Sequence, residues 1–216
     1  DRWYQAALEY EVDYFVNTYN VLSADNFYGE DPNKVFAEPR KLILAATLNE
    51  NAITLNHNGV EREYLLHVPE LYTGAVAVPL VMNFHGGGGT ATGQMYLADM
   101  RPIADTANFI LVYPQGLHLD NGGSTHWNSM LLSDSNKSTV DDFGFIDALI
   151  NELSLTYNID TKRLYATGFS NGADIAFALG CYLNSSIAAV APVSGLMLHN
   201  PSSDNCTPSN RVGVMI

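Results

Sequence analysis

The sequence predicts an α/β protein in which a mostly parallel sheet carries helices on both faces. Three observations support this prediction. Apolar runs of buried-strand type alternate with helical segments, a hairpin pattern precedes them, and one strand leads through a tight turn directly into an alanine-rich helix. Strands that alternate with helices are joined by right-handed crossovers, which make the strands parallel. The 216 residues suffice for one sizeable domain with its own core.

Residues 1–40 differ from the rest of the chain in composition and in pattern. Aromatic and apolar side chains recur at helical spacing up to about residue 20, so we expect an amphipathic helix there. Residues 20–39 are rich in Asn, Asp, Pro and aromatic residues and are expected to be irregular. We expect residues 1–40 to form a cap on the main domain, which comprises residues 41–216. A lid over the site and the remnant of another domain are the alternatives.

Apolar and polar residues alternate from Ile53 onward. Asn58 and Gly59 are a strong hairpin signal, and the alternation resumes after them up to Pro69, which predicts a β-hairpin at the edge of the sheet. Buried strands are expected at Leu80–Phe84, Phe109–Tyr113, Leu164–Thr167, Ile187–Val193 and Val212–Ile216. Helices are expected at Gly93–Thr106, Asp141–Tyr157 and Ala173–Leu183.

The stretch Gly168-Phe169-Ser170-Asn171-Gly172 is a G-x-S-x-G pentapeptide between a predicted strand and a predicted helix. Strand, tight turn and helix are the parts of a nucleophile elbow, in which the serine adopts a strained conformation. Side chains at the two outer glycine positions would collide with the neighbouring strand and helix. Ser170 is therefore predicted to project clear of the sheet, at the positive end of a helix dipole.

A second motif, His85-Gly86-Gly87-Gly88-Gly89, follows an earlier buried strand. Glycines allow a backbone to approach a substrate and to turn its N–H groups inward. Ester hydrolysis by serine needs a nucleophile, a base and donors for the oxyanion. Ser170 supplies the nucleophile, and the amides of Asn171 and Gly87, with Gly86 as the alternative, are the predicted donors. A glycine loop can also bind phosphate, but neither the P-loop nor the dinucleotide pattern is present.

The charge of the chain restricts its partners. It carries 23 acidic and 10 basic residues, a formal net charge of −13. Such a charge argues against nucleic acid and anionic membrane surfaces as partners and suits a neutral substrate, although it also simply keeps a protein soluble. No apolar run approaches the ~18 residues of a membrane-spanning helix.

These motifs resemble the α/β-hydrolase family of secreted polyhydroxybutyrate depolymerases, feruloyl esterases and acetylxylan esterases. The resemblance covers about residues 53–216 in register and is specific for the family, not for a substrate. The matching stretches are Arg62–Pro69, His85–Gly89, Tyr113–Gly116, Trp127–Asn128, Val140–Ile146, Gly168–Gly172 and Ala191–Gly195.

The resemblance implies a secreted serine carboxylic-ester hydrolase that forms an acyl-enzyme on Ser170 and needs no metal or cofactor. Its substrates would be polyester or plant-polysaccharide esters, namely polyhydroxyalkanoate, feruloyl, acetyl or aromatic polyester groups. A peptidase of the same fold and a non-catalytic binding protein that retains the fold are the alternatives. The resemblance also places Trp127 near the substrate cleft, where it would be an aromatic platform. Packing beneath the loop is the alternative for this residue.

The two cysteines, Cys181 and Cys206, can form at most one bridge or remain two buried thiols. The family often has a cysteine after the elbow helix and a Cys-x-Pro before the next strand. Cys181 and Cys206-Thr207-Pro208 match this pattern. The resemblance therefore implies a disulfide between them, in keeping with an extracellular location.

The other two members of a catalytic triad cannot be assigned within these residues. In such families the acid and then the histidine follow later strands, so the resemblance places both beyond Ile216. We therefore expect the hydrolase domain to be incomplete at its C-terminus and completed by another segment or chain. The family usually has a second glycine after the elbow, where this chain has Ala173. Alanine is small enough to be tolerated there.

The remaining histidines and acids receive other expectations. His85 is expected to anchor the glycine loop, and His57 and His67 to be surface or edge residues. His118 and His126 are candidate substrate contacts. His199 and Asp204 are weak candidates for the triad base and acid. Asp141 and Asp142 are expected to cap the start of a helix and to make local hydrogen bonds.

Overall fold

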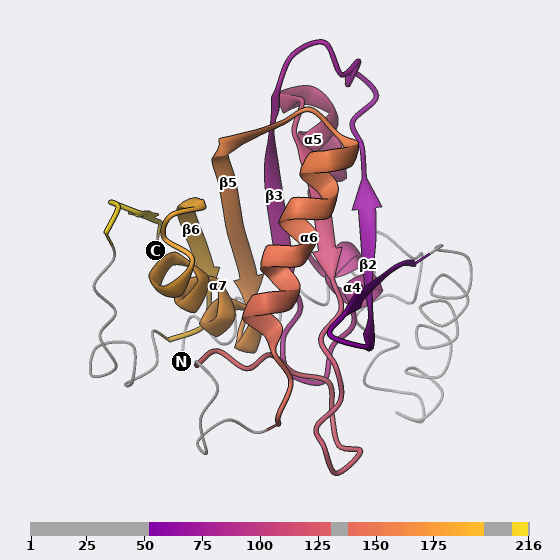
Figure 1. The fold of residues 1–216 in the computed structure, drawn as a ribbon, viewed down its shortest axis with the longest axis vertical. Coiled ribbons are helices and arrows are strands. Elements are labelled where there is room, and N and C mark those ends of the chain that lie inside the picture. Colours follow the sequence, from indigo (N-terminus) through magenta and orange to yellow (C-terminus); the bar gives the residue numbers. More distant parts are fainter. Residues whose placement is uncertain (1–51, 131–137, 197–208, 216) are drawn as a thin grey trace, which may run out of the picture. The chain divides into compact units, whose positions relative to one another are not determined.

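A mixed sheet forms the centre of the domain in the computed structural model, which describes residues 52–130, 138–196 and 209–215 (Figure 1). The predicted helix and irregular segment within residues 1–40 lie outside these ranges, as do His199, Asp204 and Cys206. The described residues all belong to the unit Asn51–Ile216.

Seven strands in the described ranges are ordered β1-β2-β4-β3-β5-β6-β7. β1 pairs with β2 and β2 with β4 in the antiparallel sense, and every other neighbouring pair is parallel. The prediction of an edge hairpin followed by a parallel sheet is thus confirmed. The strands are β1 (Ile53–His57), β2 (Val60–His67), β3 (Val78–Phe84), β4 (Ile110–Pro114), β5 (Ile159–Phe169), β6 (Ile187–Val193) and β7 (Gly213–Val214).

The hairpin turns at the predicted residues. His57 pairs with Val60 across the turn, and Asn58 and Gly59 have φ angles of 53° and 82°. Two consecutive residues with positive φ are what a two-residue turn needs in order to follow the twist of its strands. The turn therefore sets the register that places Arg62 and Tyr64 of β2 on the face that α6 covers.

The helices differ from the prediction in one place. They are α4 (Ala91–Leu97), α5 (Arg101–Ala107), α6 (Asp142–Thr156) and α7 (Asn171–Tyr182). The single helix expected at Gly93–Thr106 is wrong, because the chain breaks between α4 and α5. Pro102 occupies the first turn of α5, where its missing N–H costs nothing, whereas inside one long helix its ring would clash with the preceding turn. No described helix is long and apolar enough to cross a membrane.

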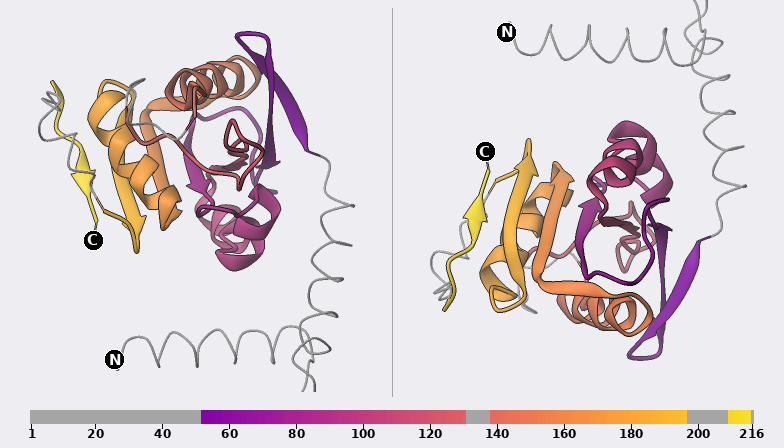
Figure 2. Two further views of the ribbon diagram at one scale, coloured as in Figure 1. Left: turned by 90° about the horizontal axis from the view of Figure 1, so that it is seen from below. Right: turned by 90° about the horizontal axis from the view of Figure 1, so that it is seen from above.

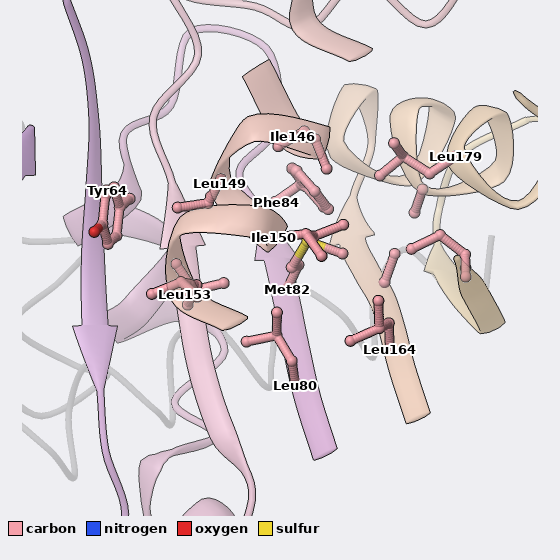
Figure 3. Close-up of a cluster of buried hydrophobic side chains, with 14 of the residues drawn as sticks. Tyr64, Leu80, Met82, Phe84, Ile146, Leu149, Ile150, Leu153, Leu164 and Leu179 are labelled. Carbon is pink, nitrogen blue, oxygen red and sulfur yellow. The ribbon is translucent and has the colours of Figure 1, made fainter. Parts of the chain in front are cut away.

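The main core lies between the sheet and helices α6 and α7 (Figure 3). The alternate β3 residues Leu80, Met82 and Phe84 meet α6 there and are fully buried. A smaller core joins α4 and α5 to the opposite face, so α6 and the α4–α5 pair lie on opposite sides of the sheet (Figure 2). Both faces carry helices, as predicted.

One part of the α4–α5 side of the sheet forms an open apolar cavity of about 460 Å³. Its lining comes from β3, β5, β6 and β7, from Met100 at the start of α5, and from Met215, which follows β7. Neither Ser170 nor the glycine loop lines this cavity. It is therefore separate from the predicted catalytic residues.

Candidate active site

Ser170 stands in a sharp turn between the end of β5 and the start of α7. Its φ and ψ are 53° and −119°, a region that a residue with a side chain rarely adopts. The Ser170 amide donates to the Val193 carbonyl at 2.9 Å, and its carbonyl accepts from Ala173 and Asp174 at 2.8 and 3.0 Å. Bonds on both sides hold the strained conformation in place. The predicted strand, turn and helix are confirmed.

The two outer glycines of the pentapeptide let the elbow pack against the end of β3. A Cβ atom on Gly168 would lie 2.7 Å from the Phe84 carbonyl oxygen, and one on Gly172 would lie 2.6 Å from the His85 carbonyl oxygen. Both obstacles are backbone atoms that cannot turn aside. Any side chain at either position would therefore push the elbow away from β3.

The glycine loop that follows β3 lies directly beside the elbow. A Cβ on Gly86 would be 3.5 Å from the Ser170 Cβ, and one on Gly87 would be 3.7 Å from the Asn171 Cβ. The Gly88 amide donates to Thr125 and the Gly89 amide to Gly86. Among the described residues, no protein acceptor bonds the amides of Gly86, Gly87 or Asn171. These amides are available to an oxyanion on Ser170, and Gly87 and Gly86 both stay candidate donors.

His85 anchors this loop, as expected from the sequence. It is 1% exposed, and the Gly116 amide donates to its Nε2 atom at 2.9 Å. Nδ1 therefore carries the proton and donates to the Gly86 carbonyl at 2.7 Å. Burial lowers the pKa of His85 to about 4, so the ring is neutral. With both nitrogens engaged, His85 is not placed to take a proton from Ser170.

Trp127 packs beneath the loop and is 2% exposed. Its indole Nε1–H donates to the His85 carbonyl at 3.0 Å, and its ring meets Phe84 edge-on with 5.2 Å between centroids. The aromatic platform predicted for Trp127 is therefore not found, because the ring has no face open to a substrate. The packing alternative describes this residue.

The Asn171 side chain pairs with the backbone of Trp127, which the sequence did not reveal. The Trp127 amide donates to Asn171 Oδ1 at 2.7 Å, and Asn171 Nδ2 donates back to the Trp127 carbonyl at 3.1 Å. This reciprocal pair ties the first residue of α7 to the loop between β4 and α6. The only sequence signal for this pair is that an asparagine side chain carries both a hydrogen-bond donor and an acceptor.

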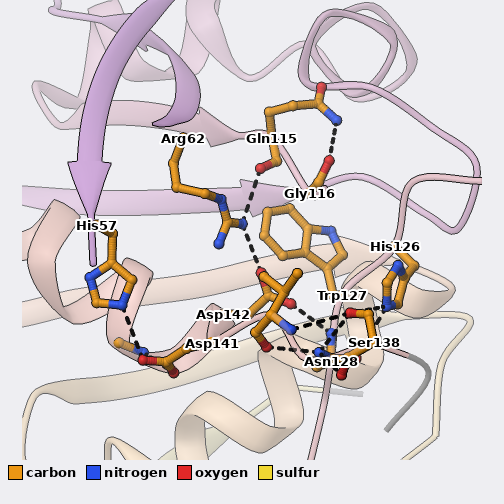
Figure 4. A network of polar contacts seen from close by, with 12 residues as sticks. His57, Arg62, Gln115, Gly116, His126, Trp127, Asn128, Ser138, Asp141 and Asp142 are labelled. Atoms are coloured by element: carbon orange, nitrogen blue, oxygen red, sulfur yellow. Dashed lines mark hydrogen bonds and ion pairs between the residues drawn. The ribbon is translucent and has the colours of Figure 1, made fainter. Parts of the chain in front are cut away.

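A buried ion pair supports the same loop from the other side (Figure 4). Arg62 Nη2 donates to Asp142 Oδ1 at 2.7 Å, and both side chains are 1% exposed. The Asn128 amide donates to Asp142 Oδ2 at 2.8 Å, and the guanidinium stacks 3.9 Å above the Phe145 ring. Burial raises the pKa of Asp142 and lowers the pKa of Arg62, while the attraction between the two charges opposes both shifts.

The two acids at the start of α6 thus have different roles. Asp141 caps the helix by accepting from the Gly144 amide at 2.9 Å, as predicted, and also contacts His57 at 3.0 Å. The expectation that Asp142 makes only local bonds is wrong. The register of the hairpin brings Arg62 of β2 over the start of α6, where its guanidinium forms an ion pair with the buried Asp142 carboxylate.

No protein-family model matches the chain, but several known proteins are similar to it in sequence. Feruloyl esterase D of Neurospora crassa is 26% identical over 168 residues, which are 73% of this chain and 53% of that protein. The probable feruloyl esterase C of Aspergillus terreus is 29% identical over 150 residues, 64% of this chain and 49% of that protein. The bifunctional acetylxylan esterase/xylanase XynS20E of Neocallimastix patriciarum is 30% identical over 117 residues, 54% of this chain and 16% of that protein.

Two solved structures are similar to the described fold. A thermostable esterase aligns with a TM-score of 0.59 and 21% identity, covering 80% of this chain and 47% of that one. The acetyl xylan esterase from Aspergillus awamori aligns with a TM-score of 0.56 and 17% identity, covering 68% and 52%. The chain has the α/β-hydrolase fold. It spans about half the length, or less, of these relatives.

The described histidines of this α/β-hydrolase chain make bonds elsewhere than at Ser170. His126 is 7% exposed, and its Nε2 lies 3.1 Å from Asn128 Oδ1, so it is not an open substrate contact. His118 is exposed, and its role as a substrate contact stays a prediction. The bonded partners of the others are Asp141 for His57, Asp105 for His67, and Gly86 and Gly116 for His85.

The remaining predictions concern the cysteines and metal binding. Cys181, near the end of α7, is buried, but Cys206 lies outside the described residues, so their bridge stays a prediction. Within the described ranges, no group of three or more His, Cys, Asp or Glu side chains is placed to hold a metal ion.

Buried His85 should make the protein less stable as the pH falls from about 6.5 to about 4. In this window the unfolded chain binds a proton that the folded chain, with its His85 pKa of about 4, does not bind. The free energy of unfolding should therefore decrease with falling pH, by about 3 kcal/mol in all. Urea unfolding at several pH values measures this slope. The His85→Gln variant should show a shallower slope in the same window, and equal slopes would contradict the assignment.

Proposed function

We propose that this chain carries the nucleophile and the oxyanion hole of a serine carboxylic-ester hydrolase. The observation that carries the proposal is the strained Ser170 beside the glycine loop, in which Gly86 lies next to Ser170 and Gly87 next to Asn171. Backbone strain at a serine between a strand and a helix serves to expose its hydroxyl. The esterase names of the relatives support the same reaction.

In this mechanism the base takes the proton from Ser170 Oγ as that oxygen attacks the carbonyl carbon of the ester. The negative charge that develops on the carbonyl oxygen is held by the amides of Asn171 and Gly87, with Gly86 as the alternative to Gly87. The alcohol then leaves with a proton from the base, and Ser170 becomes an ester of the acid. Attack by water releases the acid and regenerates the serine. The positive end of α7 points at the reacting oxygen and favours its charge.

The base and the acid of the triad are proposed to come from residues outside these 216. The described histidines support this placement, because each makes its bonds away from Ser170. The relatives offer room for such residues, since the chain spans about half of their length. The segment that completes the site would be the chain's main partner.

Feruloyl or acetyl esters of plant polysaccharides are the proposed substrates, because the relatives are named feruloyl and acetylxylan esterases. Hydroxyalkanoate and aromatic polyesters are a wider possibility within the same chemistry. The net charge of −13 suits a neutral ester and disfavours nucleic acid or anionic membranes as partners. Secretion is also proposed, because the polysaccharides that carry the proposed ester groups lie outside the cell.

Covalent labelling and a substrate panel test the proposal together. In the full-length protein, a fluorophosphonate should phosphonylate Ser170 with loss of fluoride, which adds the mass of the reagent less HF, and methyl ferulate and p-nitrophenyl acetate should be hydrolysed. A poly(3-hydroxybutyrate) film tests the polyester class, and a peptide p-nitroanilide tests for a peptidase. Faster cleavage of the anilide than of any ester would replace the esterase by a peptidase. Neither labelling nor turnover would indicate a binding protein that retains the fold.

A further inference from the structure

Trp127 is bonded to both segments that carry the candidate oxyanion amides. Its backbone forms the reciprocal pair with the Asn171 side chain, at 2.7 and 3.1 Å. Its indole N–H donates to the His85 carbonyl at 3.0 Å. One buried residue thus connects the start of α7 with the glycine loop, although the two segments lie far apart in the sequence.

The bond from the Trp127 indole to the His85 carbonyl affects the direction of the Gly86 amide, because peptide groups are planar. The His85 carbonyl and the Gly86 N–H belong to one peptide plane, so a bond that holds the carbonyl also sets the direction of that N–H. The next plane joins the Gly86 carbonyl to the Gly87 N–H. That carbonyl accepts from His85 Nδ1 at 2.7 Å and from the Gly89 amide at 3.0 Å. The Trp127 side chain therefore orients the Gly86 amide, and the His85 side chain orients the Gly87 amide.

Trp127 is itself held rigidly. Its ring packs edge-on to Phe84 and lies 5.0 Å from the His85 ring, with 2% of the residue exposed. The next residue, Asn128, donates its amide to the buried Asp142 carboxylate at 2.8 Å and its side chain to the Val140 carbonyl at 2.8 Å. A group fixed on several sides can transmit position, whereas a mobile group cannot.

We propose that Trp127 is a positioning residue of the oxyanion hole, which sets the amides of the glycine loop and of Asn171 relative to each other. The inference rests on the proposed esterase function. Trp127 does not touch the substrate, since its ring is buried. It acts through the His85–Gly86 peptide and through the Asn171 side chain. Losing the indole bond leaves the buried His85 carbonyl without that donor, so the peptide plane can tilt and its amide can move away from the oxyanion.

The Trp127→Phe variant tests the proposal, because it removes the indole N–H and keeps a buried aromatic ring. In the full-length protein, we expect kcat to fall 10- to 100-fold with KM changed less than about twofold, since oxyanion donors act in the transition state. The rate of inactivation by a fluorophosphonate should fall in parallel. Both readouts report the oxyanion hole when the rates are expressed per folded molecule, which unfolding curves of the variant at the assay temperature provide.

Tyr64→Phe is the matched control. It removes one hydrogen bond from another buried ring, the bond from Tyr64 Oη to Glu152 at 3.2 Å, on the β2 side of the sheet. Its kcat should stay within about twofold of the wild type, whatever the change in melting temperature. If Trp127→Phe shows the same kinetics as Tyr64→Phe, the proposal is overturned.

A second variant keeps the proposal testable if Trp127→Phe does not fold. Asn171→Ala removes the other arm of the bridge and leaves the Asn171 backbone amide, and we expect a similar loss of kcat at unchanged KM. An unaltered kcat in this variant would refute the role of the bridge. The proposed function fails separately. If the esterase rate does not depend on Ser170, the enzyme mechanism is wrong, whereas Ser170-dependent turnover with unaltered kcat in these variants rejects only the positioning role.

Discussion

Replacing Ser170 by alanine should lower the kcat for ester hydrolysis by the full-length protein about 10⁶-fold, to a residual rate set by binding and the oxyanion hole. The reason lies in the elbow, where Ser170 stands in a strained turn beside the glycine loop. The substitution removes one oxygen and keeps the backbone, whose bonds to Val193, Ala173 and Asp174 do not involve the side chain. Stability should therefore change little. Initial rates with p-nitrophenyl acetate measure the effect.

Residual contamination by a host esterase is the main source of error in that measurement. The variant should also fail to react with a fluorophosphonate, which gives an independent readout on the same sample. Matching melting temperatures of wild type and variant establish that both are folded. A rate equal to that of the wild type in a folded Ser170→Ala variant would refute the proposed mechanism.

Replacing Arg62 by methionine should lower the free energy of unfolding by about 3 to 5 kcal/mol. The reason is that Asp142 is 1% exposed and would lose its only described cationic partner. An unpaired buried carboxylate must either stay charged in a poorly polarisable site or take up a proton. Urea unfolding near neutral pH measures the loss.

Two further variants separate the ion pair from simple packing. In Arg62→Met/Asp142→Leu, both charges are gone, and much of the stability should return because replacing a whole buried pair is often neutral. Arg163→Met removes a solvent-exposed pair with Asp160 and should have a much smaller effect, because water screens those charges. Equal losses in Arg62→Met and Arg163→Met would contradict the importance of burial.

Local patterns carried the predictions that the structure confirmed. The Asn58-Gly59 turn, the pentapeptide around Ser170 and the glycine loop each depend on a few consecutive residues. In each, a residue that tolerates positive φ or close approach stands where the backbone needs it. Such requirements act within one turn of chain and can be read without knowing the rest of the fold.

The predictions that failed concern contacts between distant parts of the chain. Trp127 looked equally suited to a cleft and to a core, and only its burial against Phe84 and His85 decides the matter. Asp142 looked like a helix-start residue, and its partner Arg62 lies 80 positions earlier in the sequence. The break before α5 was missed because apolar spacing continued across it, although Pro102 was a local signal for it.

The sequence by itself determined the class of fold, the identity of the candidate nucleophile and the presence of a glycine loop to serve it. It could do so because these features depend on local properties, namely the periodicity of strands and helices and the conformational freedom of glycine. Only the tertiary structure decided that Trp127 joins Asn171 to His85 and that a buried ion pair holds the adjoining loop. The physical reason is that burial and hydrogen bonding between distant segments depend on how the sheet and its helices pack, and packing is a property of the whole domain.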